Sequence, residues 1–348
     1  MTDMTPIRSP EQAPILLQVR DLKVHFPITQ GLLRRTVGHV KAVDGVSFDV
    51  RQGEVLGLVG ESGCGKTTTG RALLRIVDPT SGSIHFRRPD GQEVDVINAG
   101  PAELRRIRRD MRMVFQDPNA SLNPRLPVGE IIGQSLEYNG IAKAEADDRV
   151  ATLLRRVGLR PEYIKRYPHA FSGGERQRIG IARALALNPA FVVCDEAVSA
   201  LDVSVQAQIL RLLRELKREF NLTYLFVGHD LAVIQHICDR VAVMYAGKLV
   251  EIGPTQTLFD KPRHPYTEAL LSAVPRPDPR LRRKGERIRL QGEVADVTNL
   301  PKGCAFHPRC RYATDICRAE VPQLKNFANG QAAACHHAES LELSGTTV

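Results

Sequence analysis

The stretch that decides the fold runs Val55-Leu56-Gly57-Leu58-Val59-Gly60-Glu61-Ser62-Gly63-Cys64-Gly65-Lys66-Thr67. Its first five residues form a short apolar run, which is typical of a strand buried on both faces. Residues 60–67 fit the spacing G-x-x-x-x-G-K-[ST]. A helical pattern follows through Leu73 and Val77, and Pro79 ends it. The strand, the loop and the helix together predict a phosphate-binding loop in an α/β fold.

Each residue type in this loop suits the binding of phosphates. Glycines let backbone N–H groups turn inward around phosphate oxygens, and the following helix adds the positive end of its dipole. Lys66 is placed to reach the β- and γ-phosphates of a nucleotide, and the Thr67 hydroxyl is placed to hold Mg²⁺. The candidate nucleotide-binding residues here are Gly60, Glu61, Ser62, Gly63, Cys64, Gly65, Lys66, Thr67 and Thr68.

Two acidic residues follow a second buried apolar run, Phe191–Cys194. Sites of open α/β sheets lie at the carboxyl ends of strands, where these acids stand. Asp195 is placed to bind Mg²⁺, and Glu196 is placed to polarise an attacking water as a general base. Beside a phosphate loop, this pair favours nucleotide hydrolysis over a strand end without function.

Ser172-Gly173-Gly174-Glu175 predicts a second anion-binding helix N-terminus. One nucleotide does not need two phosphate-binding sites from the same chain. Two chains that face each other would use both, because each chain would complete the nucleotide site of the other. Taken alone, such a triplet is also compatible with a simple helix cap.

Composition argues against a disordered, a collagen-like or a disulfide-dense protein. The chain has 348 residues, a net charge of +9, 43% apolar and 25% charged residues, as in an ordinary soluble protein. No apolar run approaches the ~18 residues of a membrane-spanning helix. Residues 1–14 lack the basic start and apolar stretch of a secretion signal, so we expect a cytosolic protein with reduced cysteines.

Strand and helix patterns alternate along the chain, which favours a mainly parallel sheet covered by helices. Strands are expected over 16–24, 41–50, 222–227 and 240–245, and helices over 128–158 and 205–216. After residue 255 prolines cluster, and seven basic residues fall between Arg276 and Arg289. We therefore expect a core domain over residues 15–255 and a small extension over residues 256–348.

Over residues 15–345 the sequence resembles the ATP-binding subunits of ABC transporters. Gly60–Thr67 is similar to their Walker A loop, Ser172–Glu175 to their signature loop, and Asp195 with Glu196 to their Walker B acids. The resemblance implies ATP and Mg²⁺ as ligands. It also implies a RecA-like core, an antiparallel β subdomain, a helical subdomain over about residues 117–175 and a Cys-rich C-terminal extension.

The resemblance assigns roles to further residues. Phe26 matches the aromatic that stacks on adenine, and Gln116 matches the Q-loop, which senses Mg²⁺ and the membrane partner. Ser199 and Asp202 match the D-loop, and His229 matches the switch histidine that contacts the γ-phosphate. The sequence departs from the family at Glu175, where glutamine is commoner, and at Ala197, where proline is usual.

The resemblance is closer to the oligopeptide/dipeptide importers, and within them to the F-type of two ATPase subunits. Residues 60–66, 194–204 and 264–267 carry it. It implies ATP-driven import of dipeptides or oligopeptides, or of nickel or glutathione as in related systems. It also implies a D-type ATPase partner, two membrane permeases that dock near residues 119–124, an external solute-binding protein, and a peripheral location on the cytoplasmic face of the inner membrane.

Four of the seven cysteines fall in the C-terminal region, namely Cys304, Cys310, Cys317 and Cys335. Disulfides are disfavoured in a reducing cytosol, whereas four thiolates suit Zn²⁺ or an iron–sulfur cluster. The lack of paired C-x₂-C spacings disfavours zinc, the resemblance implies a [4Fe-4S] cluster, and a tail without metal is the third alternative. The other three cysteines, Cys64, Cys194 and Cys238, are expected to be small packed residues.

Two rival classes remain open from the sequence. A nucleic-acid-associated ABC ATPase fits the positive charge, but the chain has one cassette and no long coiled coil. A stand-alone phosphate-loop kinase or GTPase leaves Ser172–Gly174 and His229 without a role. We therefore expect no nucleic acid as partner.

Overall fold

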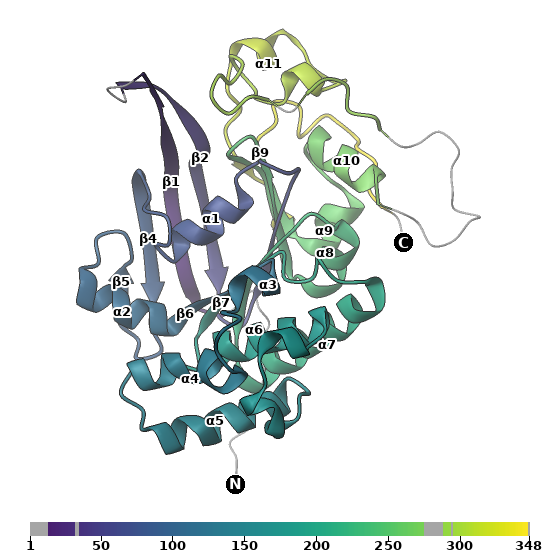
Figure 1. Ribbon diagram of the computed structural model, residues 1–348. Coiled ribbons are helices and arrows are strands. Elements are labelled where there is room, and N and C mark those ends of the chain that lie inside the picture. Colours follow the sequence, from purple (N-terminus) through teal and green to yellow (C-terminus); the bar gives the residue numbers. More distant parts are fainter. Residues whose placement is uncertain (1–12, 32–34, 275–287, 294, 347–348) are drawn as a thin grey trace. The chain divides into compact units, whose positions relative to one another are not determined.

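The computed structural model describes residues 13–31, 35–274, 288–293 and 295–346 (Figure 1). The chain divides into two compact units. The first unit consists of Met1–Leu16, Val50–Glu54 and Phe86–Val227, and the second of Leu17–Asp49, Val55–His85 and Gly228–Val348. Residues 1–12 lie outside the described residues, and they include most of the N-terminus in which we expect no secretion signal. Residues 275–287 also lie outside, and they include most of the basic, proline-rich segment. The predicted boundary between residues 255 and 256 stays a prediction.

Three parallel strands form the sheet of the first unit. They are β6 (Met111–Val114), β7 (Phe191–Asp195) and β8 (Thr223–Gly228). β7 lies in the middle, and its Phe191 is paired with Met111 on one side and Thr223 on the other. Every residue of β7 is buried, as its apolar run predicts. The parallel order brings the carboxyl ends of these strands to one edge, where Asp195 ends β7.

Helices pack together in the first unit, and α4, α5 and α6 are in mutual contact (Figure 1). Residues 128–158 form two helices and not the single one expected, because the chain turns at Gly140, which has φ 84°. The helices are α2 (Pro101–Asp110), α3 (Pro118–Ser121), α4 (Val128–Tyr138), α5 (Lys143–Arg156), α6 (Gly173–Leu185) and α7 (Val203–Phe220). Short elements are β5 (Glu93–Asp95) and the 3₁₀ turns Pro161–Lys165 and Pro168–Ala170.

Two groups of strands form the second unit. One has the order β2-β1-β4, with β1 (Ile15–Gln30), β2 (Arg35–Arg51) and β4 (Ser81–Arg87). In the other, β3 (Val55–Val59) runs parallel to β9 (Arg240–Tyr245), and β10 (Lys248–Pro254) is antiparallel to β9. The short strands β12 (Ala332–Ala333) and β11 (Lys325–Asn326) extend this group beyond β10. Residues near the C-terminus therefore belong to the same sheet as the strand before the phosphate loop.

The helices of the second unit are short. They are α1 (Lys66–Leu73), α8 (Leu231–Ile237), α9 (Thr255–Asp260), α10 (Pro265–Ser272) and α11 (Asp315–Ala319), and a 3₁₀ turn covers His307–Arg309. α1 ends four residues earlier than the expected Val77, because Arg75 adopts a left-handed backbone with φ 47°.

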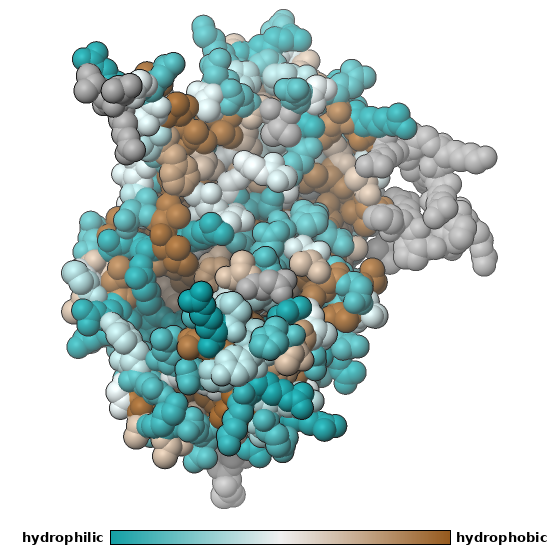
Figure 2. All heavy atoms as spheres, in the orientation of Figure 1, coloured by the Kyte–Doolittle hydropathy of each residue, from teal (hydrophilic) through white to brown (hydrophobic). Residues whose placement is uncertain are grey.

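Polar side chains dominate the visible surface over α4 and α5, and hydrophobic side chains stand there in small groups (Figure 2). Within the ranges that the structure describes, no helix combines the length and the hydropathy that crossing a membrane requires.

A buried carboxyl group joins three segments of the second unit. Glu251 in β10 is fully buried. Its carboxylate oxygens accept hydrogen bonds from the backbone N–H groups of Arg263 at 2.7 Å and His264 at 3.1 Å, and from Nε2 of Gln331 at 3.4 Å. Burial raises the pKa of Glu251 to about 7 and lowers the pKa of His264 to about 3.

We predict that Glu251→Gln changes the pH dependence of stability. Between pH 4.5, the ordinary pKa, and pH 7 the folded state holds the Glu251 proton and the unfolded state releases it, so this group lowers the free energy of unfolding as pH rises. From pH 4.5 to pH 7 the wild type should therefore lose about 3 kcal/mol of unfolding free energy relative to the variant. The contribution of His264 to the free energy of unfolding rises with pH in both proteins, so it cancels in the difference between them. Urea denaturation at several pH values measures the difference, and parallel profiles would contradict the prediction.

Candidate functional site

The phosphate loop is a tight turn held against two neighbouring strands. Gly60 and Gly65 have φ values of 152° and 103°, which only glycine adopts readily. A Cβ atom would lie 2.2 Å from the Met244 carbonyl oxygen at Gly60 and 2.1 Å from the Ala42 carbonyl oxygen at Gly65. The loop therefore requires glycine at both positions, for conformation and for space.

Lys66 lies at the end of this loop, where α1 begins. Its side chain is buried, and Nζ donates hydrogen bonds to the carbonyl oxygens of Gly60 at 2.8 Å and Glu61 at 2.9 Å. No side chain caps the N-terminus of α1 at Gly65. The ammonium group and the first N–H groups of a helix thus stand at one loop, which is the chemistry of a polyphosphate site.

Two more expected nucleotide residues belong to the second unit. Phe26 lies in β1 and is 40% exposed, as a stacking surface for a base must be. His229 is exposed and follows β8, and the next residue, Asp230, caps α8 by accepting the Ala232 N–H at 2.9 Å.

In the first unit, the structure brings together Gln116 and Glu196. Nε2 of Gln116 donates a hydrogen bond of 2.9 Å to Oε2 of Glu196, across 80 residues of sequence. The backbone of Glu196 is left-handed with φ 46°, and its N–H donates to the Val227 carbonyl oxygen at 3.0 Å. Such a backbone costs energy in a non-glycine residue and is typical of functional positions. Asp195, directly before it, is 1% exposed.

Ser172 begins α6 with a capping box. Its hydroxyl accepts the Glu175 N–H at 3.3 Å, and Oε2 of Glu175 accepts the Ser172 N–H and hydroxyl, each at 2.9 Å. A Cβ atom at Gly174 would lie 2.6 Å from Cγ1 of Val205, so glycine allows α6 to approach α7 closely. Glu175 thus fulfils the role that glutamate and glutamine share at this position of a capping box.

The residues matching the D-loop stabilise the start of α7. Asp202 accepts the Ser204 hydroxyl at 2.7 Å and the Val205 N–H at 3.0 Å, and these hydrogen bonds hold its pKa below the ordinary value. The Ser199 hydroxyl donates to the Glu196 carbonyl oxygen at 3.0 Å. Ser199 is therefore tied directly to the residue expected to act as general base.

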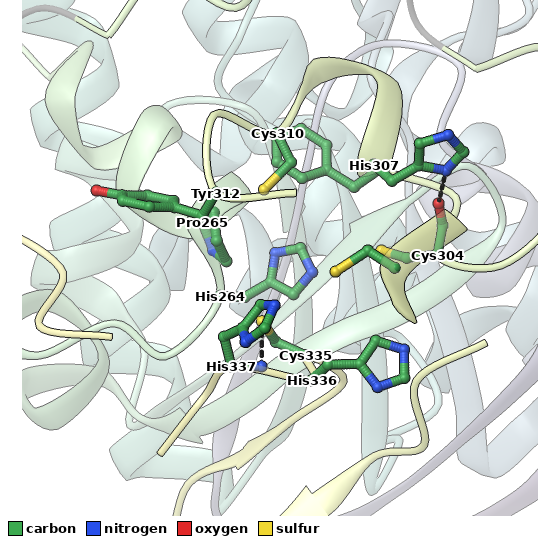
Figure 3. Close-up of a pocket in the computed structure, with 11 residues that line it drawn as sticks. His264, Pro265, Cys304, His307, Cys310, Tyr312, Cys335, His336 and His337 are labelled. Carbon is green, nitrogen blue, oxygen red and sulfur yellow. Dashed lines mark hydrogen bonds between the residues drawn. The ribbon is translucent and has the colours of Figure 1, made fainter. Parts of the chain in front are cut away.

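The four C-terminal cysteines line one pocket. Figure 3 labels Cys304, Cys310 and Cys335 around it, and Cys317 also lines it, together with His264, His307, His336 and His337. Among the residues that the structure describes, no group of three or more His, Cys, Asp or Glu side chains has the arrangement of a metal site. The donor set suits a soft metal centre, although the side chains do not have that geometry.

Desolvation dominates the chemistry of these thiols. Burial is the main cause that raises the pKa of Cys310 to about 11 and that of Cys335 to about 12, and the neighbouring cysteines contribute in the same direction. Cys310 and Cys335 therefore hold their protons at neutral pH. The remaining cysteines, Cys64, Cys194 and Cys238, are buried, as expected of packing residues.

Sequence reasoning missed two residues that contact the phosphate loop. Arg309 forms an ion pair with Glu61, and the Tyr266 hydroxyl accepts the Glu61 N–H. Tyr266 stands in the 264–267 stretch that carried part of the resemblance, whereas no local signal marks Arg309.

Two family models match the sequence. One is described as ABC transporter and matches residues 43–199. The other is described as Oligopeptide/dipeptide transporter, C-terminal region, and matches residues 250–317.

Curated relatives match nearly the whole chain. It is 53% identical to the oligopeptide transport ATP-binding protein AppF of Bacillus subtilis (strain 168), over 92% of this chain and 97% of that protein. It is 49% identical to the di/tripeptide transport ATP-binding protein DppF of Pseudomonas aeruginosa (strain UCBPP-PA14), over 93% of this chain and 98% of that protein.

Solved structures show the same fold. The chain is similar to the ATP-binding cassette MJ0796 bound to ADP and Pi, with a TM-score of 0.59, 26% identity, and coverage of 69% of this chain and 99% of that one. It is similar to cbiO1 from Clostridium perfringens, part of an ABC transporter complex, with a TM-score of 0.58, 27% identity, and coverage of 70% and 90%. These similarities confirm the predicted α/β nucleotide-binding fold.

We predict that Gly65→Ala abolishes nucleotide binding. A methyl group has no room beside the Ala42 carbonyl oxygen, so the loop must move. Gly140→Ala is the matched control, because Gly140 also has a positive φ, of 84°, nothing lies within 4 Å of its Cβ position, and it stands outside the phosphate loop. The control should lose only the ~1–2 kcal/mol of a left-handed backbone and keep its affinity. Calorimetric titration with ATP measures both, and equal affinities of the two variants would contradict the argument.

Proposed function

This chain belongs to the ATP-binding subunits of ABC transporters of the oligopeptide and dipeptide type, and from this premise we propose that it hydrolyses ATP to drive uptake of dipeptides or oligopeptides. ATPase activity follows from the family. The solute class rests on one observation, the 53% and 49% identity over almost full length to relatives named for oligopeptide and di/tripeptide transport.

The proposed roles on the nucleotide divide between binding and hydrolysis. Phe26 stacks on adenine, the N–H groups of residues 60–68 surround the phosphates, and Lys66 reaches the β- and γ-phosphates. Thr67, Gln116 and Asp195 supply the hard oxygen ligands that suit Mg²⁺, whose charge offsets that of the phosphates when it is bound.

Hydrolysis requires a base beside the γ-phosphate. In the proposed reaction Glu196 takes a proton from water as the water oxygen bonds to the γ-phosphorus, and the bond between that phosphorus and the ADP oxygen breaks. His229 donates a hydrogen bond to the γ-phosphate. The Gln116–Glu196 hydrogen bond of 2.9 Å supports this assignment, because it holds the carboxylate in one orientation.

A second ATPase subunit completes the proposed mechanism. Residues 172–175 act on the ATP of that partner, and Ser199 and Asp202 belong to the same contact. The position of residues 172–175 at the N-terminus of α6 supports an anion-binding role, because a helix N-terminus attracts anions. A D-type heterodimer is our preferred partner, and a second copy of this chain is the alternative.

We place the subunit on the cytoplasmic face of the inner membrane as a peripheral protein. Two permease subunits supply the path through the membrane and dock near residues 119–124, and an external solute-binding protein delivers the solute. The family and the names of the relatives support this assembly. The basic net charge of +9 suits an anionic membrane surface, so it does not require a nucleic acid.

The most specific part of the proposal is a metal centre in the C-terminal extension. Cys304, Cys310, Cys317 and Cys335 would hold a [4Fe-4S] cluster, and their convergence on one pocket supports it. Such a cluster would crosslink a region with little core of its own. Zinc and an empty thiol pocket are the two alternatives.

We predict that Glu196→Gln lowers ATP turnover of the assembled transporter by about 10²–10⁴-fold, the usual contribution of a general base, while ATP binding is retained. Glu215→Gln is the control, since Glu215 is 60% exposed on α7 and pairs only with Arg211 among the ion pairs of the described residues. Uptake by vesicles that contain the permeases and the solute-binding protein tests the solute. Near-normal turnover of Glu196→Gln contradicts the assigned base, and uptake of nickel or glutathione without peptides contradicts the solute class.

We predict that full-length protein purified without oxygen contains iron and acid-labile sulfide and absorbs visible light. Cys335→Ser should lower the iron content, whereas Cys238→Ala, which changes a buried cysteine outside the pocket, should not. A colourless protein without iron contradicts the cluster, and bound zinc would favour that alternative.

A further inference from the structure

An arginine of the C-terminal extension reaches the phosphate loop. Nη1 of Arg309 donates to Oε2 of Glu61 at 2.6 Å, and Nη2 donates to Oε1 at 3.1 Å. The two hydrogen bonds form a bidentate fork, the geometry in which arginine binds a carboxylate most strongly. The fork joins residues that are 248 positions apart in the sequence.

Glu61 is also held through its main chain. Its N–H donates to the Tyr266 hydroxyl at 2.8 Å, and its carbonyl oxygen accepts from Nζ of Lys66 at 2.9 Å. The residue that the extension holds therefore contacts the lysine that we assign to the phosphates. A displacement of Glu61 would change the position of the Lys66 ammonium group.

The fork is partly shielded from water. The Arg309 side chain is 7% exposed and that of Glu61 is 26% exposed. The Arg309 guanidinium lies 5.9 Å from the centre of the Tyr245 ring, and Tyr245, Tyr266 and Phe306 pack with ring centres 4.8–5.4 Å apart. Because the medium is only partly aqueous, the charge on Glu61 would act strongly on its surroundings if Arg309 were absent.

Short backbone hydrogen bonds fix Arg309 to the cysteine segment, which we define as residues 303–318. The Cys304 N–H donates to the Cys317 carbonyl oxygen at 2.8 Å, and the Arg309 N–H donates to the Phe306 carbonyl oxygen at 3.0 Å. Arg309 is followed directly by Cys310, which lines the cysteine pocket. The cysteine segment and the phosphate loop are thus joined by a continuous set of contacts.

We propose that Arg309 is a positioning residue for ATP binding, which neutralises and orients Glu61 and so couples the affinity of the phosphate loop to the folded state of the cysteine segment. The inference rests on the proposed nucleotide site and is independent of the transported solute and of any metal. Without Arg309, an unpaired carboxylate remains on the loop that receives a polyanion. The coupling is reciprocal, so bound ATP stabilises the cysteine segment in turn.

The test is a set of four full-length proteins titrated with ATP. Arg309→Met should weaken binding by about tenfold, a usual size for coupling between sites. Glu61→Gln keeps the main-chain groups that we place at the phosphates and removes only the carboxylate charge, so it should weaken binding less than Arg309→Met does. The double variant should recover most of the affinity lost in Arg309→Met, because the unpaired charge is then gone. A merely structural Arg309 predicts that the double variant binds as weakly as Arg309→Met.

Arg311→Met is the matched control. Arg311 lies two residues further along, and its Nη2 binds both carboxylate oxygens of Glu268 at 3.1 Å, in α10 and not in the phosphate loop. This variant should bind ATP as the wild type does. An Arg309→Met protein with wild-type affinity, a double variant without recovery, or an equal loss in Arg311→Met each overturns the inference.

Hydrogen exchange of the wild type gives a second readout that needs no variant. Amides of residues 303–318 should exchange several-fold more slowly when ATP is bound, and unchanged exchange overturns the coupling. If the wild type binds no ATP, the proposed function fails. If it binds ATP and Arg309 has no effect on the affinity, only the present inference fails.

Discussion

The phosphate loop depends on the close approach of its backbone to two carbonyl groups. Glycine alone fits at Gly60, against Met244 in β9, and at Gly65, against Ala42 in β2. β9 is far from the loop in sequence and β2 precedes β3, so the loop acquires its shape only when both strands are folded beside it. The same turn places the N-terminus of α1 and the Lys66 ammonium group together. The nucleotide site is thus a product of tertiary packing, although eight consecutive residues reveal it.

Features set by neighbouring residues were predictable from the sequence. The buried strands β3 and β7 follow from short apolar runs, and the buried face of α7 follows from apolar residues at helical spacing. Errors arose where one residue departs from a regular pattern. Gly140 divides an expected helix in two, and the left-handed backbone of Arg75 shortens α1. Gly140 follows Asn139, and this dipeptide is itself a turn signal, whereas no local signal marks Arg75.

Contacts between distant segments were not predictable in the same way. The pairing of Gln116 with Glu196 was expected only as far as both match family motifs, and its 2.9 Å hydrogen bond comes from the structure. No pattern links Glu61 to Arg309, because an ion pair leaves no periodicity and one sequence carries no covariation. The four cysteines in the sequence predicted a metal centre, and the structure places them around one pocket without the geometry of a metal site in the described residues. That geometry depends on the packing of the whole extension.

The short strand β12 links the C-terminal extension to the cassette. Ala332 and Ala333 pair with Ile252 and Glu251 of β10, and thereby occupy the outer side of that strand. A chain cut after the cassette would leave the N–H and C=O groups of β10 open along a mostly buried, apolar strand. Open edges of this kind recruit other chains and lead to aggregation. The extension thus covers part of an edge of β10 that the cassette alone would expose.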